Sequence, residues 1–194
     1  MTYKYNKVYI DNTYTVAGTY ENDGPLANFF DKTYPKDMYF GSTSWEHAEI
    51  KLLKESIAGL LKKTNNKTSD IDIIISGDLQ NQIASSNYAI REFDIPFLGI
   101  YNACAISSEG IIIASTFINS GKAKKCIVAT SSHNMAAEKQ YRNPTEYGTP
   151  KPKVATFTAT GGASILLTNK KSKIKISSAT IGKIIDKGVK DVNN

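Results

Sequence analysis

The chain has 194 residues, 41% hydrophobic and 22% charged, which is typical of one globular domain and excludes disordered and fibrous classes. Its net charge of +6 is compatible with nucleic acid, an anionic membrane surface or a small anionic ligand. Only two arginines accompany the lysines, and no basic stripe interleaved with aromatic residues is present, so we expect no nucleic-acid partner.

No apolar run approaches the roughly 20 residues that a membrane-spanning helix needs, and no apolar signal region follows the first residues. We therefore expect a soluble chain. The two cysteines, Cys104 and Cys126, do not make a disulfide framework, and the two histidines, His47 and His133, add no metal-ligand spacing. We expect no metal and no cofactor.

The first half of the chain predicts a strand, a loop and then alternating helices and strands. Loose alternation predicts a strand over residues 8–16, and a loop follows over 18–35. Thr43 and Glu46 have the spacing of a capping box, which predicts the start of an amphipathic helix that lies on a sheet. The short apolar run 71–75 predicts a buried parallel strand, and a helix over 81–92 leads to a strand over 97–101.

A helix over 105–120 is apolar in nearly every direction, so we expect it to be buried. A strand over 126–130, a long polar segment over 134–153 and strands over 163–167 and 174–179 follow it. This alternation predicts right-handed crossovers in a parallel sheet, where ligands gather at the carboxyl ends of strands. Asp78, Cys104 and residues 131–133 all follow such ends.

Cys104 lies where a strand ends and a helix begins. The first free N–H groups and the positive end of the helix dipole favour a thiolate there, as a nucleophile requires. The alternative is a small inert core residue at a tight turn. Cys126, within an apolar strand, is expected in the core.

Three of four further polar residues allow two interpretations. His133 either orients a ligand or faces water, and His47 is expected to be a half-exposed structural residue. Asp78 either caps the next helix or contacts a ligand. Arg142 suits a carboxylate because a guanidinium donates two parallel hydrogen bonds, and an ion pair with Glu138 competes for it.

The run Asn-Ala-Cys-Ala-Ile-Ser at residues 102–107 is similar to the nucleophile elbow of thiolases and ketoacyl synthases. More specific motifs resemble one branch, the stage V sporulation protein AD family of endospore formers. They are Asp-Gly-Pro-Leu at 23–26, Phe-Asp-Lys-Thr-Tyr at 30–34, Ser-Gly-Asp-Leu at 76–79, Ala-Thr-Ser-Ser-His-Asn at 129–134 and Pro-Thr-Glu-Tyr-Gly at 144–148. These motifs run through almost the whole chain.

The resemblance implies an α/β fold: a thiolase-like α-β-α arrangement with a mixed, mostly parallel sheet. The thiolase fold is duplicated, and residues 1–194 resemble only its first half, an N-terminal thiolase-like domain. The other half is where thiolase-like enzymes keep their histidines and second cysteine. Half of a duplicated fold leaves its partner surface bare, so we expect an uncovered face or edge and association into homo-oligomers.

The resemblance also implies a binding component rather than an enzyme. Members of this branch take up dipicolinic acid (pyridine-2,6-dicarboxylate), alone or as its calcium complex, into the developing spore. They work beside membrane-embedded sporulation proteins, which implies a peripheral place at the inner spore membrane. The residues expected to bind the ligand are Cys104, Ala105, Ser131, Ser132, His133, Asn134 and Arg142. Ala105 departs from the branch, where a hydroxyl residue often follows the cysteine.

Two other functions stay open. A thiolase-like acyltransferase or condensing enzyme would form a thioester on Cys104, which needs a base within hydrogen-bond reach of the sulfur. Neither His47 nor His133 sits where that family keeps its bases. A docking subunit that only scaffolds membrane partners is compatible with the lysines.

Overall fold

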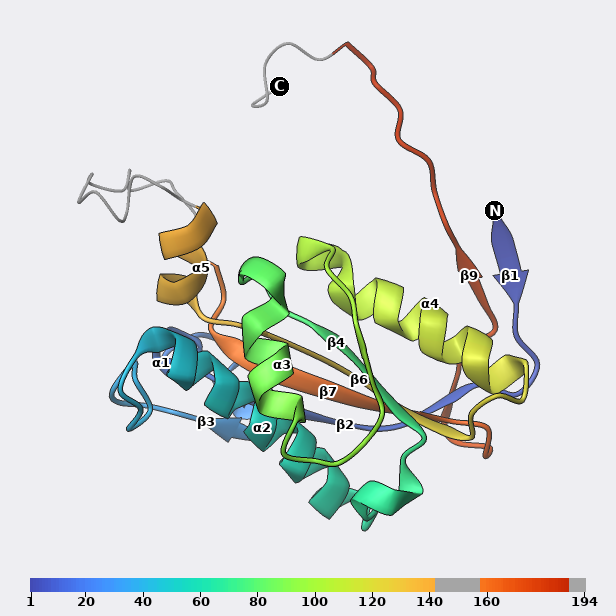
Figure 1. Cartoon of the computed structure of the whole chain (residues 1–194), viewed down its shortest axis with the longest axis horizontal. Helices are drawn as coiled ribbons and strands as arrows, with labels where there is room; N and C mark the ends of the chain where they lie inside the picture. The colour runs from blue at the N-terminus through green and yellow to red at the C-terminus, as the bar shows by residue number, and fades with distance from the viewer. Residues whose placement is uncertain (142–157, 189–194) are drawn as a thin grey trace.

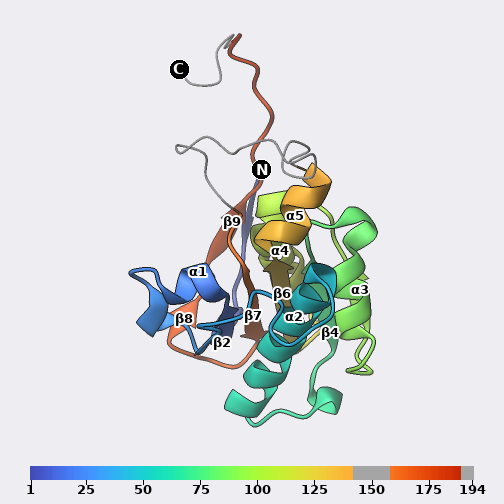
Figure 2. The same cartoon turned by 90° about the vertical axis from the view of Figure 1, so that its left-hand side faces the viewer.

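The computed structural model describes residues 1–141 and 158–188. Its central sheet contains, in spatial order, β3 (Lys32–Thr33), β2 (Tyr9–Ala17), β7 (Gly161–Thr168), β6 (Lys125–Ser132), β4 (Ile73–Gly77) and β5 (Phe97–Gly99). Helices α2 (Trp45–Lys63) and α3 (Ala84–Ile90) pack on one face and α4 (Ile106–Asn119) on the other (Figures 1 and 2). The predicted α-β-α layering is confirmed.

The parallel strands behave as the apolar runs predicted. Strand β4 pairs in parallel with β5 and β6, so the carboxyl ends of all three meet at one edge of the sheet. Strand β4 begins two residues later than predicted. The Asp72 carboxylate lies just before it and accepts the N–H groups of Lys124 at 2.6 Å and Lys125 at 2.9 Å. Strand β7 is antiparallel to both β2 and β6, which makes the sheet mixed.

Helix α2 lies close against the sheet. Its N-cap is Ser44, one residue after the predicted Thr43, and the Ser44 hydroxyl accepts the N–H of His47 at 3.2 Å. The helix backbone approaches β7 so closely that a Cβ at Gly162 would lie 2.5 Å from the carbonyl oxygen of Leu52. A glycine is therefore required at this point of the strand.

Several segments differ from the prediction. The predicted helix over 81–92 is broken, because Gln82 and Ile83 are left-handed (φ 58° and 49°) before α3 begins. The predicted loop over 18–35 holds α1 (Thr19–Asn22), a 3-10 helix (Ala27–Phe29) and β3. Helix α5 (Asn134–Tyr141) begins inside the predicted polar loop. The last predicted strand divides into β8 (Ile174–Lys175), which pairs with β2, and β9 (Ser178–Thr180), which pairs with β1 (Thr2–Lys4).

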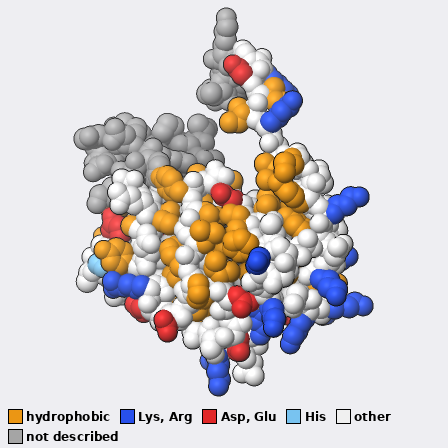
Figure 3. Space-filling model, turned by 45° about the vertical axis from the view of Figure 1, so that its right-hand side comes forward, with side chains coloured by type: hydrophobic (Ala, Val, Ile, Leu, Met, Phe, Trp, Pro, Cys, Tyr) orange, Lys and Arg blue, Asp and Glu red, His pale blue; other side chains and the backbone are white. Residues whose placement is uncertain are grey.

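The prediction that α4 is buried all round is wrong. Its inner face is buried at Ile106, Ala114 and Ile118, but residues 111–113 and Phe117 remain partly exposed. Figure 3 shows hydrophobic side chains gathered over one face of the molecule. Near the end of β5, Leu98 is 36% and Tyr101 55% exposed. The exposed apolar surface is therefore larger than single, scattered hydrophobic residues would give.

Candidate functional site

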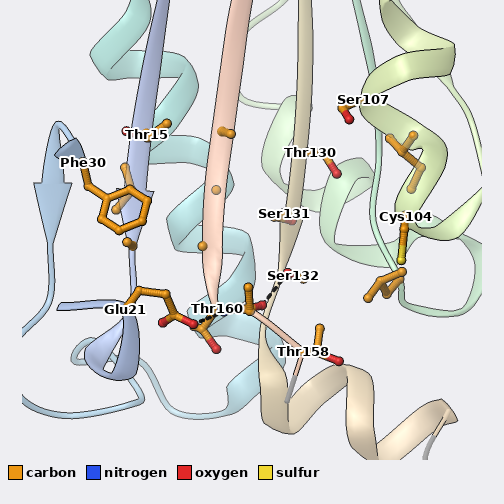
Figure 4. A pocket seen from close by; sticks show the side chains of 18 of the residues that line it. Thr15, Glu21, Phe30, Cys104, Ser107, Thr130, Ser131, Ser132, Thr158 and Thr160 are labelled. Atoms are coloured by element: carbon orange, nitrogen blue, oxygen red, sulfur yellow. Dashed lines mark hydrogen bonds between the residues drawn. The ribbon is translucent and has the colours of Figure 1, made fainter. Parts of the chain in front are cut away.

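A cavity of about 530 Å³ opens at the edge where β4, β5 and β6 end, on the α4 face of the sheet. Figure 4 shows the Cys104 thiol on one side of this cavity and Thr15 and Phe30 on the other. Most of the lining side chains are small or carry hydroxyl groups. The residues that line the cavity include Thr15, Ala17, Glu21, Phe30, Cys104, Ser107, Thr130, Ser132, Gly161 and Ala163.

The strand-to-helix elbow around Cys104 is as predicted. After β5 the backbone turns through Ala103, which has a left-handed φ of 43°, and the exposed Cys104 lies in a 3-10 helix just before α4. No side chain caps the N-terminus of α4, while the N–H of Ala105 donates to the carbonyl of Asn102 at 2.9 Å. The elbow thus presents an accessible thiol beside the positive end of a helix dipole. The core interpretation of Cys104 is wrong, whereas Cys126 is buried as predicted.

The end of β6 divides its side chains between two faces of the sheet. Cys126 and Val128 pack on the α4 side, and Ile127 and Ala129 pack on the α2 side. Because side chains alternate along a strand, Thr130 and Ser132 follow the first pair toward the cavity and Ser131 points toward α2.

The hydroxyl groups on both faces have hydrogen-bond acceptors. Thr130 Oγ1 donates to the carbonyl of Gly77 at 3.1 Å, and Ser132 Oγ donates to that of Ala159 at 2.5 Å. Ser131 Oγ donates to the Glu49 carboxylate at 3.1 Å. The structure therefore places Ser131 and Ser132 at the cavity and adds Thr130, which the sequence interpretation omitted, while the Ser131 hydroxyl itself donates to Glu49.

His133 and Asn134 lie inside the protein rather than on the cavity wall. His133 is completely buried, with Nε2 2.8 Å from the carbonyl of Met38 and Nδ1 accepting the N–H of Met135 at 3.2 Å. Burial lowers the pKa of this imidazole, so its neutral form is favoured. Asn134 accepts the hydroxyl of Thr160 at 2.9 Å. Both residues fix the turn after β6.

The other candidates are placed as follows. His47 is exposed on α2, across the sheet from Cys104. Asp78 is buried and accepts the N–H groups of Gln80 at 2.9 Å and Ser86 at 2.7 Å, so it holds the start of α3 as a capping role requires. Desolvation raises its pKa. Arg142 lies outside the described residues.

Two acidic residues near the cavity were missed. Glu21 lies on the cavity wall, where one carboxylate oxygen accepts the N–H of Thr160 at 2.9 Å and the other is buried without a described partner. Glu49 is completely buried on α2 beneath the end of β6. The sequence did carry a signal for Glu49, because it follows Ala48 and precedes Leu52 by three positions, on the apolar face of the predicted helix.

Within residues 1–141 and 158–188 no group of His, Cys, Asp or Glu is arranged to hold a metal ion. In the same residues no helix has the length and apolar character needed to cross a membrane.

A mixed sheet between helical layers, with a cysteine at the elbow that follows a parallel strand, defines the chain as thiolase-like. Crystal structures of OleA variants from Xanthomonas campestris share this fold. One has a TM-score of 0.58 at 14% identity and covers 86% of this chain and 59% of that one. Another, bound with cerulenin, has a TM-score of 0.56 at 13% identity and covers 85% and 57%.

The chain belongs to the stage V sporulation protein AD family, whose model matches residues 2–194. A relative from Bacillus subtilis (strain 168), stage V sporulation protein AD, is 43% identical over 184 residues, which are 95% of this chain and 54% of the relative. The chain thus spans about half the length of that relative. Family membership supports a role in sporulation and confirms the resemblance inferred from the motifs.

Proposed function

We propose that this chain contributes to the binding of dipicolinic acid for its uptake into the developing spore, through the cavity beside Cys104. The observation that carries the proposal is an accessible thiol and an uncapped helix N-terminus opening onto a cavity of about 530 Å³. This volume is within the range of about 300–1,000 Å³ that small-molecule sites occupy. The family's role in sporulation supports the choice of ligand.

The shape and chemistry of the cavity suit a flat dicarboxylate. Small residues, Ala17, Gly161 and Ala163, leave the sheet surface open to an aromatic ring. The end of α4 beside Cys104 favours negative charge, so one carboxylate of the ligand is expected there. The hydroxyl oxygens of Thr130 and Ser132 keep lone pairs for a ligand or for bridging water.

Glu21 favours the calcium complex over the free dianion. Its carboxylate lies on the cavity wall and has no salt-bridge partner among the described residues. A second carboxylate brought toward it would be repelled, whereas a calcium ion carried by the ligand would neutralise that repulsion. We therefore expect calcium to strengthen binding and Glu21→Gln to reduce this dependence on calcium.

The second candidate function is acyl transfer on Cys104, which the exposed thiol favours. That chemistry needs a base within hydrogen-bond reach of the sulfur. His133 is buried with both ring nitrogens engaged, and His47 lies on the other side of the sheet. Neither histidine therefore serves as that base within this chain.

Calorimetry tests the two functions. The chain is titrated with dipicolinate, with and without calcium, and with isophthalate, which has the same two carboxylates but no ring nitrogen. Binding of dipicolinate that weakens about fivefold in Cys104→Ala, the scale of one lost hydrogen bond, agrees with the proposal. Absence of dipicolinate binding, together with an acyl mass on Cys104 after incubation with acyl-coenzyme A, would favour acyl transfer.

We further propose that the chain acts beside membrane-embedded sporulation proteins at the inner spore membrane, and that duplex DNA does not bind it. Coprecipitation of these membrane proteins with the full-length relative tests the first statement. A scaffold without ligand binding would precipitate them while giving no dipicolinate heat.

A further inference from the structure

A buried carboxyl group on α2 joins the segments that form one wall of the cavity. Glu49 has no solvent-exposed surface. One of its oxygens accepts the Ser131 hydroxyl at 3.1 Å, and the other accepts Gln80 Nε2 at 2.9 Å. The carboxylate therefore accepts hydrogen bonds from the end of β6 and from the segment after β4.

The network continues beyond Glu49. Gln80 Nε2 uses its second hydrogen to reach Ser85 Oγ at 2.8 Å, and the Gln80 N–H donates to Asp78. Every hydrogen of the Gln80 amide thus has an acceptor. Such a network specifies one arrangement of its segments, because moving any member leaves a buried polar group unsatisfied.

The direction of Ser131 connects this network to the cavity on the other side of the sheet. Ser131 points to Glu49, so the adjacent Thr130 and Ser132 side chains must point to the cavity. A local rotation of β6 that broke the Ser131–Glu49 hydrogen bond would turn Ser131 toward the cavity and the side chains of Thr130 and Ser132 toward α2. The Glu49 carboxylate sets this arrangement without touching the cavity.

We propose that Glu49 is a positioning residue of the cavity beside Cys104: through Ser131 and Gln80 it fixes the end of β6 in the orientation that binds ligand. This inference rests on the proposed function for its ligand, dipicolinate. It adds a residue outside the cavity on which affinity depends.

The test exploits the difference between one carboxamide oxygen and two carboxylate oxygens. Glu49→Gln replaces one accepting oxygen by an NH2 group, which leaves too few acceptors for the two donors, Ser131 and Gln80. Exchanging the pair, Glu49→Gln with Gln80→Glu, restores them: the residue 49 amide donates to the new carboxylate and its oxygen still accepts Ser131. The net charge of the pair is unchanged, which makes the double variant a matched control.

Dipicolinate affinity is measured at pH 8, above the raised pKa of Glu49, for the native chain, both single variants and the exchanged pair, under conditions where unfolding curves show each to be folded. We expect Glu49→Gln to bind about tenfold more weakly and the exchanged pair to return to within about threefold of the native affinity. An unchanged affinity in Glu49→Gln overturns the inference. So does an exchanged pair that regains native stability but not affinity.

Amide hydrogen exchange gives a readout that needs no ligand. A peptide spanning residues 129–135 should exchange faster in Glu49→Gln and return to the native rate in the exchanged pair, while residues 111–118 of α4 stay unchanged. If dipicolinate fails to bind the native chain but this pattern appears, the proposed ligand is wrong and the positioning by Glu49 stands. If dipicolinate binds and exchange does not change, the positioning inference is wrong.

Discussion

The buried carboxyl of Glu49 should make the stability of the protein fall as the pH rises through neutrality. Burial raises its pKa from 4.5 to about 7, and the nearby Asp78 carboxylate adds to the rise. Between these pH values the folded chain binds a proton that the unfolded chain has released, so this contribution is complete below about pH 4.5 and is lost as the pH passes 7. At about 1.4 kcal/mol per pKa unit, the free energy of unfolding should lose about 2 to 3 kcal/mol between pH 5 and 8.

The fold favours neutral His133 and lowers its pKa, so this residue makes the free energy of unfolding fall as the pH drops below the ordinary pKa of histidine. This pH dependence is opposite to that of Glu49. The contribution of Glu49 is therefore measured as a difference. Urea unfolding of the native chain and of Glu49→Gln is followed at pH 5, 6, 7 and 8, and the native chain should lose about 2 to 3 kcal/mol relative to the variant across this range. Glu92→Gln, which removes an exposed partner of Lys54, should give a parallel curve. A constant difference between native chain and Glu49→Gln would refute the reasoning.

Three further results are expected. Gly77→Ala should destabilise the fold by at least about 3 kcal/mol or prevent folding, because its Cβ would clash with the carbonyl oxygen of Ile100. In the control variant Gly182→Ala the new Cβ meets nothing within 4 Å, so thermal unfolding should shift little. The isolated chain should self-associate through its exposed apolar surface, and size-exclusion chromatography with light scattering that showed a stable monomer would contradict this. Fluorescence anisotropy should detect no tight, salt-sensitive binding of duplex DNA, and a steep salt slope would show the opposite.

The fold was predictable where apolar pattern and length agree. The runs that became β4 and β6 are short and apolar, and both are buried strands that pair in parallel with each other. Local sequence patterns are less informative where tertiary contacts decide the backbone conformation or the exposure of a residue. The left-handed residues Gln82 and Ile83 break a helix that composition favours. The exposed side of α4 was missed because apolar content alone does not say which faces find a partner.

The candidate site was predictable to the level of segments. The carboxyl ends of parallel strands brought the Cys104 elbow and the end of β6 together, as topology requires. The assignment of individual side chains needed the register: continuing the alternation of β6 would have directed Thr130 to the cavity and Ser131 away from it. Burial of His133 depends on contacts with Met38, 95 positions earlier, which no local pattern reveals.

The cavity beside Cys104 should bind dipicolinate without forming a covalent bond to it or to an acyl group. The decisive measurement is calorimetry of the folded chain with dipicolinate and calcium, compared with Cys104→Ala. We expect saturable binding to one site, weakened about fivefold by the substitution. No dipicolinate heat from the folded native chain at millimolar ligand, with or without calcium, would contradict it.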